Sequence, residues 1–268
     1  NISLPDTVRV GGDRLLVGGF GTGLYQWSSR NDPVSLASSP DSSAFSFDLA
    51  GNLIAALTYE DNLRLLEYTG APDLVERGRF DLSGMAEDVA FLETTAYLAD
   101  NLGGLRVLEV ANAAPPQLLA SIRRDDPSLD NTSPRLVRAL GANRLAVASF
   151  NRLVLIDVST PVRPRRLASY GNENRNIVDL EHRNDECYLV GWQSGATSAR
   201  ASFDALHLSP EGALTLRGSC SVDDLLGYSV GLAGDYALMV GLTNGLHIIR
   251  ITDPSTPQVV GRYLPANR

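Results

Sequence analysis

The stretch RLVLIDVSTPVRPRRLASY, residues 152–170, decides the fold. It opens with a polar residue, continues with an apolar one and then alternates at a period of two, which is the pattern of a half-buried β-strand. A loop containing two prolines follows and leads into a second, weaker strand. Proline is tolerated at the entry of an edge strand because no ladder donor is needed there. The stretch therefore predicts a buried strand, a turn and an outer strand.

Five further segments resemble RLVLIDV and divide the chain into repeats. They are GLYQWSS at 23–29, NLRLLEY at 62–68, GLRVLEV at 104–110, SFDALHL at 202–208 and GLHIIRI at 245–251. With Leu24, Leu63, Leu105, Leu153, Phe203 and Leu246 as equivalents, the spacings are 39, 42, 48, 50 and 43 residues. A recurring period in this range is typical of repeat architectures such as solenoids and propellers.

Each repeat contains two more strands ahead of this segment. A short apolar run such as LAVAS at 145–149 precedes it, and before that run lies a strand that ends in a Gly, Asn or Asp turn, as in VRALGANR at 137–144. Turns of this composition indicate β-hairpins. Each unit is then four antiparallel strands, ordered from inner to outer, and such units bury both faces when stacked radially into a ring.

We therefore predict an all-β fold, a single β-propeller domain of six blades with four antiparallel strands each. The fifth unit diverges most, so five or seven blades remain alternatives, and residues 1–6 are an alternative addition to the last blade's outer edge. The expected blades are residues 7–43, 44–84, 85–133, 134–174, 175–224 and 225–268.

Two of these repeats resemble the LVIVD repeat of bacterial and archaeal surface proteins. LVLIDVSTPVRPRRLASY and GLHIIRITDPSTPQVVGRY (245–263) are most similar to it, GLRVLEVANAAPPQLLAS (104–121) is less so, and the first, second and fifth units fit poorly. The resemblance implies a propeller, often exported or surface-attached. It implies no catalytic residues, because the motif describes a strand and a turn.

Composition narrows the function classes. The net charge of −8 argues against nucleic acid, because a phosphate-backbone binder needs clustered cations. All 23 basic residues are Arg, which removes lysine Schiff-base chemistry. Cys187 and Cys220 are too few for a disulfide framework, and we expect free thiols. No stretch is long and apolar enough for a transmembrane helix. The chain starts with Asn1, which we interpret as removal of a leader or a trimmed start.

Strand order predicts which loops share a face of the ring. Connections between blades lie on the same face as the loops between the second and third strands of each blade. The two long insertions, residues 123–135 and 191–202, both fall there. Function concentrates in long loops that a rigid scaffold holds, so this face is the expected site, although tolerated surface insertions explain the loops equally well.

Ten residues form the expected binding mouth on that face. Aromatic side chains interleaved with carboxylates, an amide and arginines are suited to a protein, peptide or glycan partner. The alternative is that the aromatics fill gaps between blades. The residues are Tyr59, Glu87, Asp88, Asp100, Arg135, Phe150, Arg175, Asn176, Trp192 and Tyr228.

Catalytic and metal signals are weak in this sequence. His182 lies toward the opposite face, and His207 and His247 lie on third strands of adjacent blades, too far apart to share a zinc ion. The acidic run around Asp125, Asp126 and Asp130 lacks the spacing of an EF-hand. The sequence predicts no catalytic residue, no metal and no cofactor.

The leading hypothesis is a non-enzymatic binding or scaffold propeller, exported or at the cell surface and monomeric. The alternative is a hydrolase or lyase acting on a sugar or an ester at the same mouth. Its sign would be carboxylates, or a carboxylate and an arginine, converging in a deep pocket. A purely structural module with its outer strands as docking edges is a third possibility.

Overall fold

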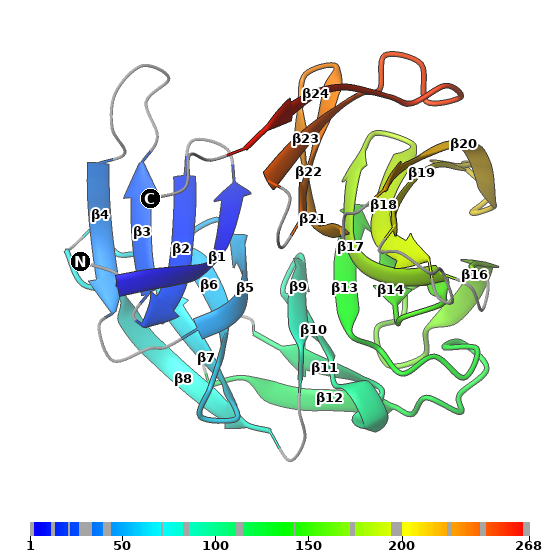
Figure 1. Cartoon of the computed structure of the whole chain (residues 1–268). Coiled ribbons are helices and arrows are strands. Elements are labelled where there is room, and N and C mark those ends of the chain that lie inside the picture. Colours follow the sequence, from blue (N-terminus) through cyan, green and yellow to red (C-terminus); the bar gives the residue numbers. More distant parts are fainter. Residues whose placement is uncertain are drawn as a thin grey trace.

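The computed structural model describes residues 3–11, 14–20, 22–26, 34–39, 44–70, 72–82, 86–110, 115–141, 143–171, 175–193, 200–223, 227–241 and 245–264. These residues form six antiparallel sheets of four strands, and within each sheet the strands follow in sequence order (Figure 1). The prediction of an all-β propeller with six four-stranded blades is therefore confirmed.

Sheets one to three are built from the first twelve strands. Sheet one contains β1 (Ser3–Gly11), β2 (Arg14–Phe20), β3 (Thr22–Gln26) and β4 (Val34–Ser39). Sheet two contains β5 (Ala44–Ala50), β6 (Leu53–Thr58), β7 (Asn62–Glu67) and β8 (Val75–Asp81). Sheet three contains β9 (Asp88–Leu92), β10 (Thr95–Ala99), β11 (Leu105–Glu109) and β12 (Gln117–Ile122), with the short 3-10 helix η1 (Asn101–Gly103) between β10 and β11.

Sheets four to six follow the same plan. Sheet four contains β13 (Leu136–Gly141), β14 (Arg144–Ala148), β15 (Leu153–Asp157) and β16 (Arg165–Tyr170). Sheet five contains β17 (Arg175–Arg183), β18 (Glu186–Gln193), β19 (Arg200–Leu208) and β20 (Leu214–Asp223). Sheet six contains β21 (Gly227–Ala233), β22 (Tyr236–Gly241), β23 (Gly245–Arg250) and β24 (Gln258–Tyr263).

The first inner strand differs from the expectation. Residues 3–6 belong to β1 and pair with β2, so they do not extend the last blade. The pairing is irregular between Ser3 and Pro5 and again between Pro5 and Thr7. Such irregularities let a strand accommodate a proline, which has no N–H to donate to the ladder.

A repeated hydrogen bond closes each of sheets two to six. The residue that ends or directly follows the third strand donates its backbone N–H to a carbonyl in the turn between the first and second strands. The pairs are Tyr68 to Asn52 (2.9 Å), Val110 to Thr94 (3.0 Å), Val158 to Asn143 (2.8 Å), Leu208 to Asp185 (2.7 Å) and Ile251 to Asp235 (2.8 Å). The same bond in five sheets shows that the repeats seen in the sequence are structurally equivalent.

Neighbouring sheets bury their apolar faces against each other. The second and third strands supply most of the core, as in β6, where five of the six residues are buried, and β15, where Leu153 to Ile156 are buried. Separate apolar clusters lie at each of the five junctions from sheets one and two to sheets five and six. Because each sheet is apolar on both sides, its stability depends on its neighbours.

Inner strands of successive sheets are linked by a chain of polar side chains. Ser46 on β5 donates to Asp88 on β9 (2.7 Å). Arg138 on β13 donates to Asp88 and, at 3.1 Å, to Asp179 on β17. Ser229 on β21 then donates to Asp179 (2.7 Å). One continuous hydrogen-bonded chain thus joins the inner strands of sheets two to six.

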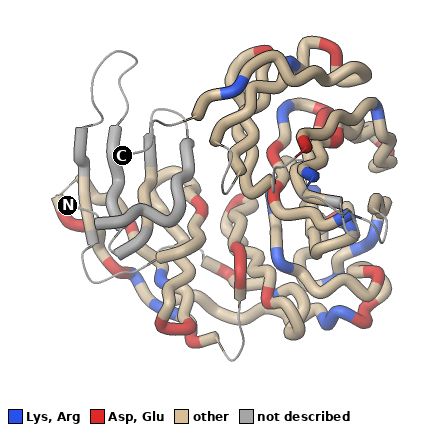
Figure 2. Tube along the Cα trace, viewed as in Figure 1, with Lys and Arg blue, Asp and Glu red and all other residues tan. Residues whose placement is uncertain are grey.

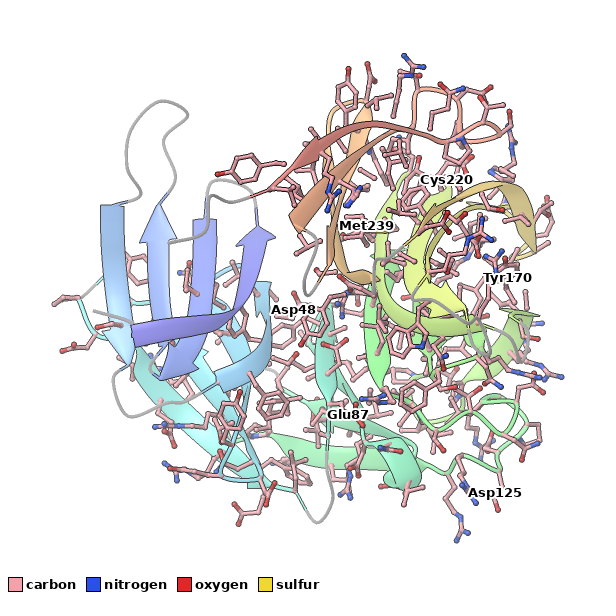
Figure 3. All side chains as sticks on the ribbon, in the orientation of Figure 1. Asp48, Glu87, Asp125, Tyr170, Cys220 and Met239 are labelled. Atoms are coloured by element: carbon pink, nitrogen blue, oxygen red, sulfur yellow. The ribbon has the colours of Figure 1, made fainter. Side chains whose placement is uncertain are left out.

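Three inner-strand carboxylates also anchor the backbone of the next sheet. Figure 3 shows one of them, Asp48, near the centre of the ring. The bonds run from the N–H groups of Phe91 to Asp48 (2.8 Å), Val137 to Asp88 (2.9 Å) and Val230 to Asp179 (2.9 Å). Each bond fixes one inner strand against the next, so these carboxylates are structural.

Candidate functional site

The two ends of the ring differ in their side chains. The end with the sheet-to-sheet connections and the turns between second and third strands is called the connection end here. The end with the turns between first and second strands is called the turn end. The long segment at 123–135 belongs to the connection end, as the strand order predicts. Of the predicted loop at 191–202, residues 191–193 end β18 and residues 200–202 begin β19 at the same end.

Exposed apolar side chains stand at the connection end on four different sheets. They are Tyr59 (58% exposed), Leu102 (76%), Phe150 (46%) and Tyr228 (60%), from sheets two, three, four and six. The first three lie in turns between second and third strands, and the fourth lies at the start of an inner strand. Exposed apolar groups that form a continuous patch are typical of surfaces that bind other molecules.

Turns at the opposite end are built from different residues. They contain Gly51 and Asn52, Glu93 and Thr94, Asn143, Asn184 and Asp185, and Gly234 and Asp235. Val162 and Tyr236 are also exposed there, at 43% and 42%. The larger and more exposed apolar groups are therefore at the connection end.

A charged and aromatic cluster joins sheets three and four at the connection end. The guanidinium of Arg135 lies 4.0 Å from the centre of the Phe150 ring and pairs with Glu87. Asn101 donates to the other oxygen of Glu87 (2.7 Å). Cation–π geometry and a paired carboxylate hold the Phe150 ring in a fixed orientation while it stays exposed. The structure thus brings together three of the predicted residues.

A small pocket lies between sheets four and five at the same end. Its walls include two predicted residues, Arg175 and Asn176, and two residues that sequence reasoning missed, Tyr170 and Asp204. Tyr170 lies on the side of the ring formed by sheets four and five (Figure 3). Arg175 pairs with Asp204, and the Tyr170 hydroxyl donates to the same carboxylate at 3.0 Å. Burial raises the pKa of Tyr170, which keeps this hydroxyl protonated.

Three segments of the chain, residues 83–123, 143–171 and 228–265, match the family described as LVIVD repeat. The chain is a β-propeller that contains LVIVD repeats. The resemblance that the sequence suggested is therefore confirmed. The matched segments contribute to sheets three, four and six.

Solved structures share the fold of this LVIVD propeller at low sequence identity. The β-propeller domain of Cps50 (Swd1) from Myceliophteria thermophila is 12% identical, with a TM-score of 0.70 over 98% of this chain and 90% of that one. The computationally designed protein Ika8 is 10% identical, with a TM-score of 0.64 over 95% of this chain and 73% of that one. No curated protein matches the sequence. Identities this low show the fold alone.

Two predicted residues of the LVIVD propeller are buried. Asp88 is 4% exposed and belongs to the inner-strand chain. Asp100 is 1% exposed and pairs with Arg106 from the third strand of the same sheet. Both carboxylates hold the scaffold, so we leave them out of the contact surface.

Trp192 is half-buried at the end of β18, where it pairs in register with Asn176. It lies next to Gly191, which lines the pocket. Residues 194–199 of the adjoining insertion fall outside the described residues. The structure brings Trp192 to the connection end without a described contact to the Phe150 cluster.

The other insertion, 123–135, is folded onto the ring. Leu129 is fully buried in the apolar cluster between sheets three and four. Asp130 bonds Arg152 and Arg166. Burial would raise the pKa of Asp130, but these two arginines outweigh it and lower the pKa. Asp125 also pairs with Arg123, and Asp126 accepts hydrogen bonds from the backbone N–H and the hydroxyl of Ser128.

Residues of both charge signs are spread over the described sheets, as Figure 2 shows, and many carboxylates are paired with arginines. Among the described residues, no three His, Cys, Asp or Glu side chains gather in a group that could hold a metal ion. No helix in the described part of the chain is long and apolar enough to cross a lipid bilayer. Both cysteines are free thiols, as the sequence predicted.

Proposed function

We propose that this propeller is a non-catalytic binding module whose connection end holds an extended peptide segment of a protein partner. The observation that carries the proposal is the set of four exposed apolar side chains, Tyr59, Leu102, Phe150 and Tyr228, on four sheets around one end of the ring. Aromatic residues of this kind contribute much of the binding energy at protein interfaces. A peptide can contact several sheets at once.

The net charge of the chain favours one kind of peptide segment over others. The chain carries a net charge of −8, so an acidic segment is repelled at long range. Arg135 is already paired with Glu87, which leaves a neutral cluster beside the exposed Phe150 ring. A neutral or basic segment with apolar anchors fits this surface best.

The hydrolase alternative has less support. A carboxylate and an arginine do converge in the pocket, as Asp204 and Arg175. The pocket admits about one water molecule, however, which is too little for a sugar ring or an ester. A binding role therefore remains the better account of this end of the ring.

A displayed library of random peptides, selected against the immobilised protein, tests the proposal. Selected peptides are expected to bind the triple variant Tyr59→Ser, Leu102→Ser, Phe150→Ser at least about tenfold more weakly, because each anchor contributes about 1–2 kcal/mol. The matched control is Val162→Ser with Tyr236→Ser, which removes exposed apolar groups at the turn end.

Binding that survives the triple variant but not the control variant would refute the proposal, and so would a selection that enriches no peptide. A parallel array of immobilised glycans supplies the competing outcome. Binding there, with loss in the triple variant, would replace the peptide with a glycan.

We also propose that the protein acts outside the cytoplasm or at the cell surface, in keeping with the family resemblance. Labelling of intact source cells with an antibody against the propeller tests this. Labelling only after the cells are broken would contradict it.

A further inference from the structure

At one register position of the third strand, three of the sheets carry a charged residue. Val154 is buried there in sheet four, and the equivalent positions hold Arg64, Arg106 and Asp204 in sheets two, three and five. Arg64 pairs with Glu76, and Arg106 pairs with Asp100. A charge inside the blade is therefore tolerated where a partner neutralises it.

Asp204 is the acidic residue of this set, and its environment is incomplete. It is 3% exposed. One carboxylate oxygen, Oδ2, accepts hydrogen bonds from Arg175 and from the Tyr170 hydroxyl. The other, Oδ1, is buried and has no hydrogen-bond partner among the residues that the structure describes. Buried polar atoms in folded proteins nearly always have a partner, so Oδ1 is a candidate atom for holding a ligand.

Asp204 is one of the residues that line the pocket between sheets four and five. Asp204, Arg175 and Tyr170 line it together with Asn176 and Ser202, and its space admits about one water molecule. Its polar walls fall in sheet five and at the end of sheet four, and the sheet-five residues lie outside the segments that match the LVIVD repeat.

The charges around Asp204 indicate which kind of ligand can bind to Oδ1. Asp204 and Arg175 already neutralise each other. A buried cation would compete with Arg175 for the carboxylate, and a buried anion would lie against Asp204, so either one would add an unpaired charge. A neutral hydroxyl adds no charge. It can donate to Oδ1 and accept from a neighbouring donor.

We propose that this pocket is a binding site for a single neutral hydroxyl group: a water molecule in the free protein, replaced by the hydroxyl of a small primary alcohol. The pocket lies at the connection end but does not depend on the apolar contacts proposed above. The two proposals can therefore fail separately.

Crystals of the whole chain, unsoaked and soaked separately in methanol, methylammonium chloride and sodium formate, test the site. The expected result is a water oxygen within hydrogen-bonding distance of Asp204 Oδ1 in the unsoaked crystal, and a methanol oxygen at the same place after the soak. Methylammonium and formate are expected to leave that water in place.

Other outcomes overturn the proposal. Methylammonium in the pocket would make it a cation site, and formate would make it an anion site. A side chain from another part of the chain against Oδ1, or an empty pocket, would show that no ligand is needed.

The variant Asp204→Val gives the matched control, because valine already occupies the equivalent position in sheet four. It is expected to keep the fold and lose the bound oxygen. If this variant fails to fold, Tyr170→Phe serves instead, since it removes a donor to Oδ2 and leaves Oδ1 unchanged. The bound oxygen is expected to persist there, and its loss would show that Oδ1 does not hold it.

Discussion

Arg138 illustrates how single residues hold this ring together. Its guanidinium contacts Asp88 of the preceding sheet and Asp179 of the following one. Burial alone would lower the pKa of Arg138, but the two carboxylates outweigh it and raise the pKa. A cation between two anions in a buried place is favourable only as a complete set.

Replacing Arg138 with Met is expected to lower the free energy of unfolding by about 3–5 kcal/mol, because two buried carboxylates lose their partner. Urea denaturation measures this. The matched control is Arg165→Met, which removes an exposed pair with Asp157 and is expected to cost about 0–1 kcal/mol. Equal effects of the two variants would contradict the structural role of the inner-strand chain.

Cysteine reactivity gives a second test at this scale. Burial raises the pKa of Cys187 to about 12 and that of Cys220 to about 11. Both groups therefore stay as thiols at neutral and mildly alkaline pH, and the thiolate is the reactive form. Neither cysteine of the folded protein is expected to react with a disulfide reagent at pH 8, and both are expected to react in urea. Rapid reaction of either one in the native protein would contradict the described burial.

Individual residues also show where sequence reasoning stops. Nothing in the sequence separates Asp88 and Asp100 from Tyr59 and Phe150 as residues of an exposed mouth. Asp88 accepts a hydrogen bond from the Val137 N–H of the next sheet, and Asp100 accepts one from Arg106 of its own sheet; both contacts form only in the folded ring. Asp204 had a readable signal, since a lone carboxylate interrupts the apolar strand SFDALHL. That signal indicates a buried polar site, but not its partners.

The fourth strands share a feature that was not predicted from the sequence. In all six sheets the register between the third and fourth strands shifts once, near the end of the third strand. In each sheet, the last residue pair before the shift has Ala or Gly on the fourth strand. These residues are Ala37, Gly78, Ala120, Ala168, Gly218 and Gly261. Small residues leave room for the next sheet, as where Pro115 lies against Gly78.

Gly78→Ala tests this rule. A Cβ at Gly78 would lie 2.6 Å from the Cα atom of Pro115, so the loop would have to move. We expect a loss of about 1–3 kcal/mol in the free energy of unfolding, as for other overpacked sites. The control is Gly231→Ala, also in a strand, where a Cβ would meet nothing within 4 Å. Thermal or urea unfolding of the two variants compares them, and an unchanged Gly78→Ala protein would show that the outer contact is unimportant.

The whole ring could be predicted because the sequence repeats at spacings of 39 to 50 residues. Segments such as RLVLIDV and GLHIIRI recur with their turns, and each becomes the third strand of a separate sheet. The strand order then assigns each loop to one end of the ring. Contacts between sheets were not predictable, because packing across a junction joins residues about 40–50 positions apart, as Ser46 and Asp88 show. The same limit explains why the Asp204 pocket was missed.

The arrangement of the whole molecule supports the proposal that the connection end is the binding surface. Tyr59, Leu102, Phe150 and Tyr228 are brought to one end by four sheets that are separate in sequence. The most direct test is hydrogen–deuterium exchange of the protein with and without a peptide selected from the displayed library. Slower exchange is expected in the segments around these four residues and no change in the turns at 51–52, 93–94 and 184–185. Protection confined to those turns, with unchanged exchange around the four residues, would contradict the claim.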